Sequence, residues 1–290
     1  MELTSPKTIK ELLLKHGSKP NKILGQNFLI DKNVLNKIIL AADIKRSDMI
    51  LEVGPGIGTL TKELAQNAGK VIAIEKDKKM LSILKETLAE YKNIEIINAD
   101  ILSYKLQVTS YKVVANIPYY LTSPLIRKFL EAKNRPEQMV LMIQKEVAQR
   151  ICASPAVVSA EEGKTQTRRR QGYGGRGMSL LAVSVQFYAE PKIISYISKN
   201  CFMPSPKVDS AIIKITPQEK NNINAELFFR IAKAGFSQPR KQLSGNLAKN
   251  LELSKKDVET WLVKNNIKPS QRAETLSISD WQNLTNSFWL

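Results

Sequence analysis

The chain contains little histidine and little cysteine: one and two residues, respectively, among 290. The single histidine, His16, cannot supply the imidazole cluster of a catalytic metal centre, and Cys152 and Cys201 cannot form a four-cysteine zinc site or a disulfide framework. No apolar run approaches the ~18 residues of a membrane-spanning helix, and acidic Glu2 and Glu11 interrupt the uncharged stretch that a signal peptide needs. We therefore expect a cytoplasmic protein that binds no metal and contacts no membrane.

Acidic residues are also in the minority, since 44 lysines and arginines against 27 aspartates and glutamates leave a formal net charge of +17 at pH 7. The basic excess is present in each of four segments, residues 1–48, 49–150, 151–219 and 220–290. A fold that is basic throughout favours a polyanionic partner, such as the phosphate backbone of a nucleic acid. Charge alone leaves this partner open, because lysine-rich surfaces also keep proteins soluble.

Hydrophobic patterning predicts an α/β fold. From residue 49 onward, short β-branched runs alternate with segments of helical periodicity, as in a parallel sheet covered by helices. We predict strands at residues 49–53, 71–75, 94–98, 113–116, 139–143, 180–187, 192–197 and 210–215. After residue 217 the strand signals stop, and a polar segment precedes a helical region. The expected organisation is an α/β domain over residues 1–217 and a small all-α domain over residues 218–290.

Residues 154–178 interrupt this order, because they lack apolar periodicity and contain an Arg-Arg-Arg run and a Gly-rich stretch. We interpret them as an inserted basic loop. Two hypotheses remain for this loop: an arm that contacts RNA, or a disordered insertion that the fold tolerates. The composition favours the second, and deletion of residues 154–178 followed by a measurement of RNA affinity separates the two.

The first predicted strand runs directly into a glycine-rich turn of sequence Gly-Pro-Gly-Ile-Gly, which begins at Gly54 and includes Gly56. Glycines allow a tight turn and let the backbone approach a ligand at the start of the next helix. Glu75 ends the next strand, where its carboxylate is placed to accept both hydroxyls of a ribose. The pattern indicates a nucleotide-type cofactor and leaves NAD open, although Thr59 stands where the dinucleotide fingerprint has glycine.

Asp100 follows the strand predicted at residues 94–98, again at a carboxyl end, where open α/β sheets bind ligands. The amino group of an adenine is a natural partner for its carboxylate. The alternative interpretation is that Asp100 only caps the following turn.

The most specific motif follows the strand predicted at residues 113–116 and contains Asn116, Pro118 and Tyr119. The exocyclic amino group of adenine is a poor nucleophile because its lone pair is delocalised into the ring, so an enzyme must aim that lone pair at an electrophile. The Asn116 side-chain oxygen and a backbone carbonyl beside Pro118 can accept the N6 hydrogens, while the Tyr119 ring stacks on the base. Because asparagine is not a general base, the predicted catalysis is positioning and electrostatic stabilisation of the cationic amine. An ordinary β-to-α turn is the alternative.

Taken together, the glycine turn, Glu75, Asp100 and residues 116–119 resemble the S-adenosylmethionine (SAM) and amino-methylation motifs of the rRNA adenine N6-dimethyltransferases. Residues 24–29 (Leu-Gly-Gln-Asn-Phe-Leu) resemble the N-terminal cofactor motif of that family, and residues 202–210 resemble its late substrate loop. The resemblance covers residues 20 to about 284 and implies a Rossmann-like SAM-dependent methyltransferase sheet.

The same resemblance implies a role for each motif residue. Asn27 and the Leu29 backbone are expected to contact SAM near its amino-acid end, with Gly54 beneath that moiety. Glu75 is expected to hold the ribose of SAM, and Asp100 its adenine. The complete cofactor-binding set is Asn27, Leu29, Gly54, Gly56, Glu75, Asp100 and Asn116.

The catalytic set consists of Asn116, Pro118, Tyr119 and Phe202. By resemblance, Phe202 sandwiches the flipped target adenine against Tyr119. Stacking a splayed base between aromatic rings is also how proteins hold single nucleotides for chemistry. We expect Phe202 to take this role from a loop that carries Pro204 and Pro206.

Two C-terminal segments favour one branch of the family, since residues 236–243 and 272–277 look like the C-terminal domain of the small-subunit (16S) enzymes. That branch implies SAM-dependent N6,N6-dimethylation of two adjacent adenosines near the 3′ end of 16S rRNA, within an immature small ribosomal subunit and by a monomer. Family members usually have a short loop where this chain has residues 154–178.

Three alternatives remain at this point. A 23S rRNA adenine N6-methyltransferase of the antibiotic-resistance type shares the cofactor motifs. A mainly non-enzymatic small-subunit assembly factor would depend on binding to the immature subunit more than on methylation, and the intact segment 116–119 argues against a purely structural role. A DNA adenine methyltransferase is opposed by residues 272–277.

Overall fold

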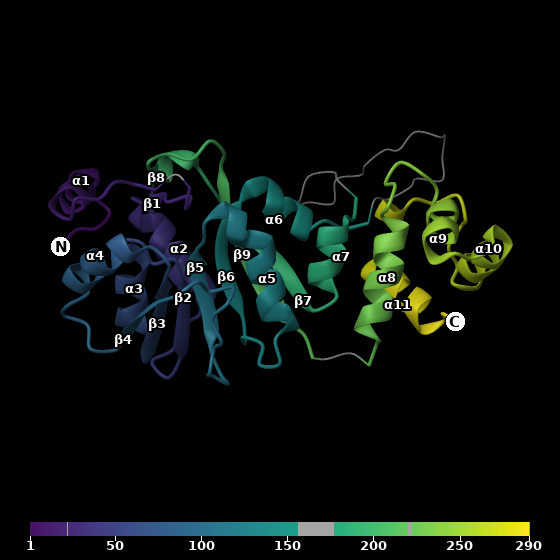
Figure 1. Ribbon diagram of the computed structural model, residues 1–290, viewed down its shortest axis with the longest axis horizontal. Helices are drawn as coiled ribbons and strands as arrows, with labels where there is room; N and C mark the ends of the chain where they lie inside the picture. Colours follow the sequence, from purple (N-terminus) through teal and green to yellow (C-terminus); the bar gives the residue numbers. More distant parts are fainter. Residues whose placement is uncertain (22, 156–176, 220–221, 290) are drawn as a thin grey trace. The chain divides into compact units, whose positions relative to one another are not determined.

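The computed structural model (Figure 1) places the chain in two compact units. The first unit comprises Met1–Ala148 and Glu190–Pro217, and the second comprises Gln149–Ala189 and Gln218–Leu290. The chain therefore passes between the units at three points along its sequence. The structure describes residues 1–21, 23–155, 177–219 and 222–289.

A seven-stranded sheet organises the first unit, and its strand order among the described residues is β4-β3-β2-β5-β6-β9-β7. Strands β2 to β6 run parallel to one another, whereas β9 lies antiparallel to β6 and separates it from β7. The strands are β2 Met49–Val53, β3 Lys70–Glu75, β4 Ile94–Asn98, β5 Lys112–Asn116, β6 Met139–Gln144, β7 Ala189–Ile197 and β9 Ser210–Pro217. The strands predicted at residues 49–53, 71–75, 94–98, 113–116, 139–143, 192–197 and 210–215 are confirmed.

Helices cover the sheet, as the alternating pattern predicts. A buried apolar cluster joins Ile38 of α2 and Leu64 of α3 to Val114 of β5 and Val140 of β6. The β-branched residues of the strands thus form the sheet side of this core. The helices are α1 Pro6–Lys15, α2 Lys32–Ala42, α3 Thr59–Asn67, α4 Lys78–Thr87, α5 Thr122–Glu131 and α6 Lys145–Ile151, with 3-10 turns η1 Tyr119–Leu121 and η2 Lys199–Cys201.

A separate two-stranded ladder joins parts of the first unit that lie far apart in the sequence. Strand β1 (Phe28–Leu29) pairs antiparallel with β8 (Phe202–Met203), and Leu29 lies opposite Phe202. The pairing brings the 24–29 segment beside the 202–210 segment. Two motifs that the sequence identifies separately therefore belong to one wall of the fold.

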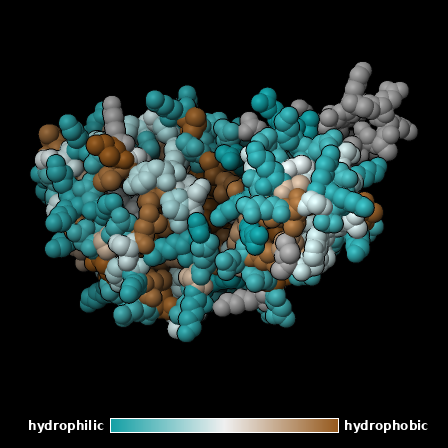
Figure 2. Space-filling view, turned by 45° about the vertical axis from the view of Figure 1, so that its right-hand side comes forward, coloured by the Kyte–Doolittle hydropathy of each residue, from teal (hydrophilic) through white to brown (hydrophobic). Residues whose placement is uncertain are grey.

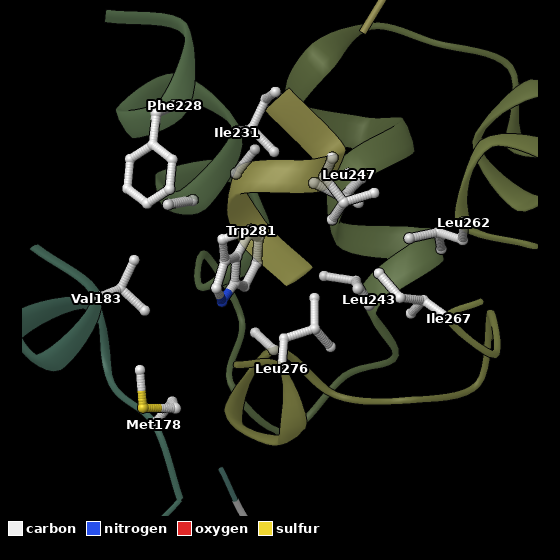
Figure 3. Close-up of a cluster of buried hydrophobic side chains, with 14 of the residues drawn as sticks. Met178, Val183, Phe228, Ile231, Leu243, Leu247, Leu262, Ile267, Leu276 and Trp281 are labelled. Atoms are coloured by element: carbon white, nitrogen blue, oxygen red, sulfur yellow. The ribbon is translucent and has the colours of Figure 1, made fainter. Parts of the chain in front are cut away.

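The second unit is helical and has its own apolar core (Figure 3). The ring of Trp281 lies among Ile231, Leu243 and Leu276 in this core. A Cβ atom added to Gly235 would overlap the Trp281 ring, so α8 reaches the tryptophan only because it ends in glycine. The helices are α7 Leu180–Gln186, α8 Ala225–Gly235, α9 Leu243–Leu251, α10 Lys255–Lys264 and α11 Ile278–Asn286, with the 3-10 turn η3 Ala273–Thr275.

One predicted strand is wrong, because residues 180–187 contain helix α7. The Ser179 hydroxyl oxygen accepts a hydrogen bond from the Ala182 N–H at 3.2 Å and thereby starts the helix. A short, continuous apolar run fits a buried strand and a buried helix equally well, so periodicity could not decide between them.

The grouping of the chain also differs from the division expected at residue 217. Ala153, Met178 and Val183 are buried in the core of the second unit, not in that of the sheet. Phe187 stacks on Phe228 with 4.0 Å between ring centroids, which ties this segment to α8. Residues 156–176 of the loop predicted at 154–178 lie outside the described residues.

The surface in view in Figure 2 is mostly hydrophilic, with small groups of hydrophobic residues between. No helix in the described parts of the chain is long and apolar enough to cross a membrane.

Candidate active site

A cavity of about 1040 Å³, including the space at its open mouth, lies in the first unit. Its walls contain the carboxyl ends of β2, β3 and β5, the segment that leads into β1, and the start of β8. This edge is where open parallel sheets bind their ligands. All ten site residues predicted from the sequence line this one cavity: Asn27, Leu29, Gly54, Gly56, Glu75, Asp100, Asn116, Pro118, Tyr119 and Phe202.

The glycine turn forms the floor of the cavity. Gly54 and Gly56 have φ angles of 69° and 60°, in the left-handed region that favours glycine. A Cβ atom on Gly56 would lie 3.2 Å from the Phe28 ring, close enough that the ring would have to shift by a few tenths of an ångström. The turn therefore needs glycine for its conformation and also for the close approach of Phe28.

Glu75 lies beside this turn, with 6% of its surface exposed. Its Oε2 accepts a hydrogen bond from the Gly56 N–H at 3.1 Å, and its Oε1 accepts one from the Asp77 N–H at 2.8 Å. Burial raises the pKa of the Glu75 carboxyl, and these N–H donors oppose the rise. These backbone donors use part of the acceptor capacity of the carboxylate, and the remainder is available to a ligand hydroxyl.

Asp100 makes two contacts at the mouth of the cavity. Its Oδ2 lies 2.8 Å from the Lys76 ammonium, and its Oδ1 accepts the Leu102 N–H at 2.9 Å. The Lys76 contact and the Leu102 bond hold the pKa of Asp100 below its usual range. The Leu102 bond caps the following turn. Asp100 therefore caps this turn, as the alternative interpretation expects, and also lines the cavity.

Asn116 is oriented by a hydrogen bond from its Nδ2 to the main-chain carbonyl of Asn27, at 3.2 Å. This bond assigns the amide nitrogen to Asn27 and leaves Oδ1 as the acceptor that the side chain offers to a ligand. Tyr119 begins the 3-10 turn η1, and its hydroxyl lies 2.8 Å from Ser210 Oγ. Burial raises the pKa of the Tyr119 hydroxyl.

Phe202 lies in strand β8, and the expected loop placement is wrong for this residue. It is 4% exposed and packs in the same core cluster as Leu29 and Ile197 while also lining the cavity. Its ladder partner Leu29 fixes its position. Stacking against the target base stays a prediction for Phe202.

Sequence reasoning assigned no individual role to several other residues of the cavity, among them Glu52, Gln26 and Lys76. Glu52 is 1% exposed, and its Oε2 has no hydrogen-bond partner in the described parts of the chain. Burial raises the pKa of the Glu52 carboxyl to about 8. An acidic residue inside the apolar strand 49–53 was a signal for a buried charge beside the site.

Gln26 fixes the segment before β1. Its Nε2 donates to Asp77 Oδ2 at 2.9 Å, and its Oε1 accepts the Asn21 N–H at 2.9 Å.

The described residues contain no group of three or more His, Cys, Asp and Glu that could hold a metal ion. The cavity therefore offers carboxylates, an amide and aromatic rings, which are groups that bind an organic ligand.

A family model described as "Ribosomal RNA adenine dimethylase" matches residues 17–162 and 158–289. The chain belongs to this family. This membership confirms the predicted methyltransferase activity on adenine of ribosomal RNA.

Related sequences extend over the whole chain. The "Ribosomal RNA small subunit methyltransferase A" of Dehalococcoides mccartyi is 42% identical and covers 95% of this chain and 90% of its own length. The protein of the same name from Clostridioides difficile is 39% identical over 98% of this chain and 96% of its own.

Solved structures of two other methyltransferases have the same Rossmann-like fold as this dimethylase. A dimethyladenosine transferase from Plasmodium falciparum superimposes with a TM-score of 0.70 at 27% identity, and covers 88% of this chain and 95% of its own. The 23S rRNA methyltransferase ErmE gives a TM-score of 0.70 at 26% identity, and covers 90% of this chain and 99% of its own. The predicted fold class is confirmed.

Proposed function

We propose that this ribosomal RNA adenine dimethylase transfers methyl groups from SAM to N6 of two adjacent adenosines near the 3′ end of 16S rRNA. The acceptor is an immature small ribosomal subunit, and the enzyme acts as a monomer in the cytoplasm. The relatives named for the small subunit support the choice of rRNA. The single observation that carries the chemistry is the Asn116 to Asn27 hydrogen bond, which presents Oδ1 as an acceptor.

The residues of the cavity fit SAM as the cofactor. The unpartnered Oε2 of buried Glu52 fits a cationic ligand, because a positive charge nearby stabilises the carboxylate. Glu75 keeps acceptor capacity for a ribose hydroxyl, and Asp100 offers a carboxylate to the amino group of an adenine. When bound, SAM supplies an electrophilic methyl group on its sulfonium. These side chains hold and orient it.

Asn116 acts on the second substrate. Its Oδ1 accepts one N6 hydrogen of the target adenosine, and this hydrogen bond strengthens as positive charge develops on nitrogen. The Tyr119 and Phe202 rings hold the base so that the N6 lone pair faces the methyl group. No side chain takes the proton, which leaves to water after the transfer. A second methylation requires the site to accept a base with one N–H, which Asn116 can still bind.

Methyl incorporation from labelled SAM tests this function. The acceptors are immature small subunits, bare 16S rRNA, 23S rRNA and duplex DNA. We expect label in immature subunits above all others, as N6,N6-dimethyladenosine at two adjacent positions. Greater incorporation of label into 23S rRNA or DNA than into immature small subunits would overturn the proposal. Tight binding to immature subunits without incorporation of label would indicate a non-enzymatic assembly factor.

A further inference from the structure

The outermost strand of the sheet, β7, carries exposed apolar side chains. Tyr196 is 42% exposed and Ile194 is 39% exposed. Residues two apart on a strand share a face, so the two side chains lie next to one another on the same side of β7. Large exposed aromatic residues on basic proteins provide surfaces for stacking nucleic-acid bases.

A lysine lies over the aromatic ring. Lys145 is the first residue of α6, and its Nζ lies 5.2 Å from the centroid of the Tyr196 ring. This arrangement is a cation–π contact, which orients both side chains. A base that stacks on this face of the Tyr196 ring displaces the ammonium group, which can then contact the phosphate of the same nucleotide.

This pair is linked to the wall of the active site through short connections. Gln144, the residue before Lys145, lies opposite Ser210 in the β6–β9 ladder. The Ser210 hydroxyl in turn lies 2.8 Å from the hydroxyl of Tyr119. The Lys145 N–H also donates to the Asp209 carbonyl at 3.0 Å. Lys145, which covers the Tyr196 ring, is therefore one residue away from the β6 residue that pairs with Ser210, the hydrogen-bond partner of Tyr119.

Charged side chains of both signs lie near this pair along the chain. Lys192 on β7 and Lys199 just after it are exposed. Glu190 is also exposed on β7, and Glu146 directly follows Lys145, so the phosphate contact is assigned to Lys145 itself and not to a uniformly basic surface. Lysines around an exposed tyrosine are the combination that single-stranded RNA recognises through phosphate and base together.

We propose that Tyr196 and Lys145 bind a nucleotide next to the target adenosine, with its base on the Tyr196 ring and its phosphate near Lys145. The inference rests on the proposed function, because it assumes an RNA substrate. This contact holds the strand on which the target adenosine is flipped, so it affects the binding of RNA and not the methyl transfer itself.

Steady-state methylation with Tyr196→Ala tests the proposal. Loss of one stacked base predicts a KM for the RNA acceptor that is raised at least about five-fold, with kcat and the KM for SAM close to wild type. Tyr196→Phe keeps the ring and is expected to restore the RNA KM to within about two-fold of wild type. Leu40→Ala removes another exposed apolar side chain of the same unit and serves as the control.

The charge contribution has its own measurement. Lys145→Met is expected to lower the slope of log affinity against log salt by about one, as for one lost phosphate contact. Lys7→Met, at an exposed site on α1, is the matched control. RNA with 4-thiouridine beside the target adenosines is expected to crosslink to the peptide that contains Tyr196.

Failure of this proposal is distinguishable from failure of the proposed function. If the wild-type protein methylates RNA while Tyr196→Ala leaves the RNA KM unchanged, the surface does not bind substrate. If Tyr196→Phe and Tyr196→Ala are equally impaired, the hydroxyl matters and stacking is wrong. If the wild-type protein methylates no RNA, the proposed function itself fails, and binding of a protein strand to the β7 edge becomes the explanation for the exposed residues.

Discussion

The amide nitrogen of Asn116 lies 3.2 Å from the main-chain carbonyl oxygen of Asn27 and donates a hydrogen bond to it. The two residues belong to the end of β5 and to the segment that leads into β1, and both line the cavity. The orientation of the proposed catalytic side chain therefore depends on the folding of the N-terminal segment.

Replacing Asn116 tests positioning as the source of catalysis. Asn116→Ala removes the acceptor for N6, and we expect methyl transfer to fall by about 100-fold or more. Dissociation constants for SAM, measured by calorimetry, are expected to stay within about ten-fold of wild type, because Glu75 and Asp100 remain. Asn116→Asp keeps an acceptor oxygen but loses the N–H that donates to Asn27. Its single-turnover rate is therefore expected to lie between those of the wild-type protein and Asn116→Ala. Full activity of Asn116→Ala would contradict the mechanism.

Lys76 sets the pH at which Asp100 loses its charge. The Lys76 contact, with the Leu102 N–H, lowers the pKa of Asp100, so in the wild-type protein the carboxylate stays ionised below its ordinary pKa. In Lys76→Met this support is lost, and Asp100 protonates at a higher pH. SAM affinity, titrated downward from pH 7, is therefore expected to begin falling at a higher pH in Lys76→Met than in wild type. Identical profiles would show that Asp100 does not contact the cofactor. Since Lys76 is exposed, the variant is expected to unfold at nearly the same urea concentration as the wild-type protein.

Glu52 makes the stability of the first unit depend on pH. Its pKa is raised by burial from 4.5 to about 8, so between these values the folded chain binds a proton that the unfolded chain has released. The free energy of unfolding is expected to fall as pH rises through this window, by at most about 1.4 kcal/mol per pH unit. Glu52→Gln carries no such group, and urea titrations followed by circular dichroism are expected to show a flatter profile. Parallel profiles for the two proteins would mean that Glu52 is ionised in the fold.

Two glycines of the second unit make a matched pair. Gly235→Ala places a methyl group against the Trp281 ring, and we expect a loss of about 1–3 kcal/mol in the free energy of unfolding, with a changed tryptophan emission. Gly245 lies within α9, and a Cβ atom there would meet nothing within 4 Å. Gly245→Ala is expected to stabilise the protein by about 0.5–1 kcal/mol. Equal effects of both substitutions would contradict the close packing of Gly235 against Trp281.

The strands were predictable because local sequence determines them. Met49–Val53 and Lys70–Glu75 combine β-branched residues with a polar or glycine boundary, and the parallel sheet follows from their alternation with helices. Residues 180–187 have the same composition and form a helix, for which the only local signal was the cap at Ser179. Composition does not show which core a short apolar segment will enter.

The site was predictable as a set of residues, while its interactions were not. Gly54, Glu75 and Asn116 follow strands directly, so parallel pairing alone brings them to one edge. The contacts of Asp100 with Lys76 and of Gln26 with Asp77 join separate loops, and their geometry depends on the assembled fold. Tyr196 lacked a motif of any kind, and its exposure became evident only when β7 was placed at the edge of the sheet.

The position of β9 between β6 and β7 has a consequence for synthesis of the chain. Strand β7 is translated before β9, and it has no neighbour in the sheet until β9 has emerged and paired with β6. A nascent or truncated chain that stops before residue 210 therefore exposes the open edge of β6 together with an unpaired β7. Such edges associate readily with other chains, so incomplete translation products of this protein are the forms most exposed to aggregation.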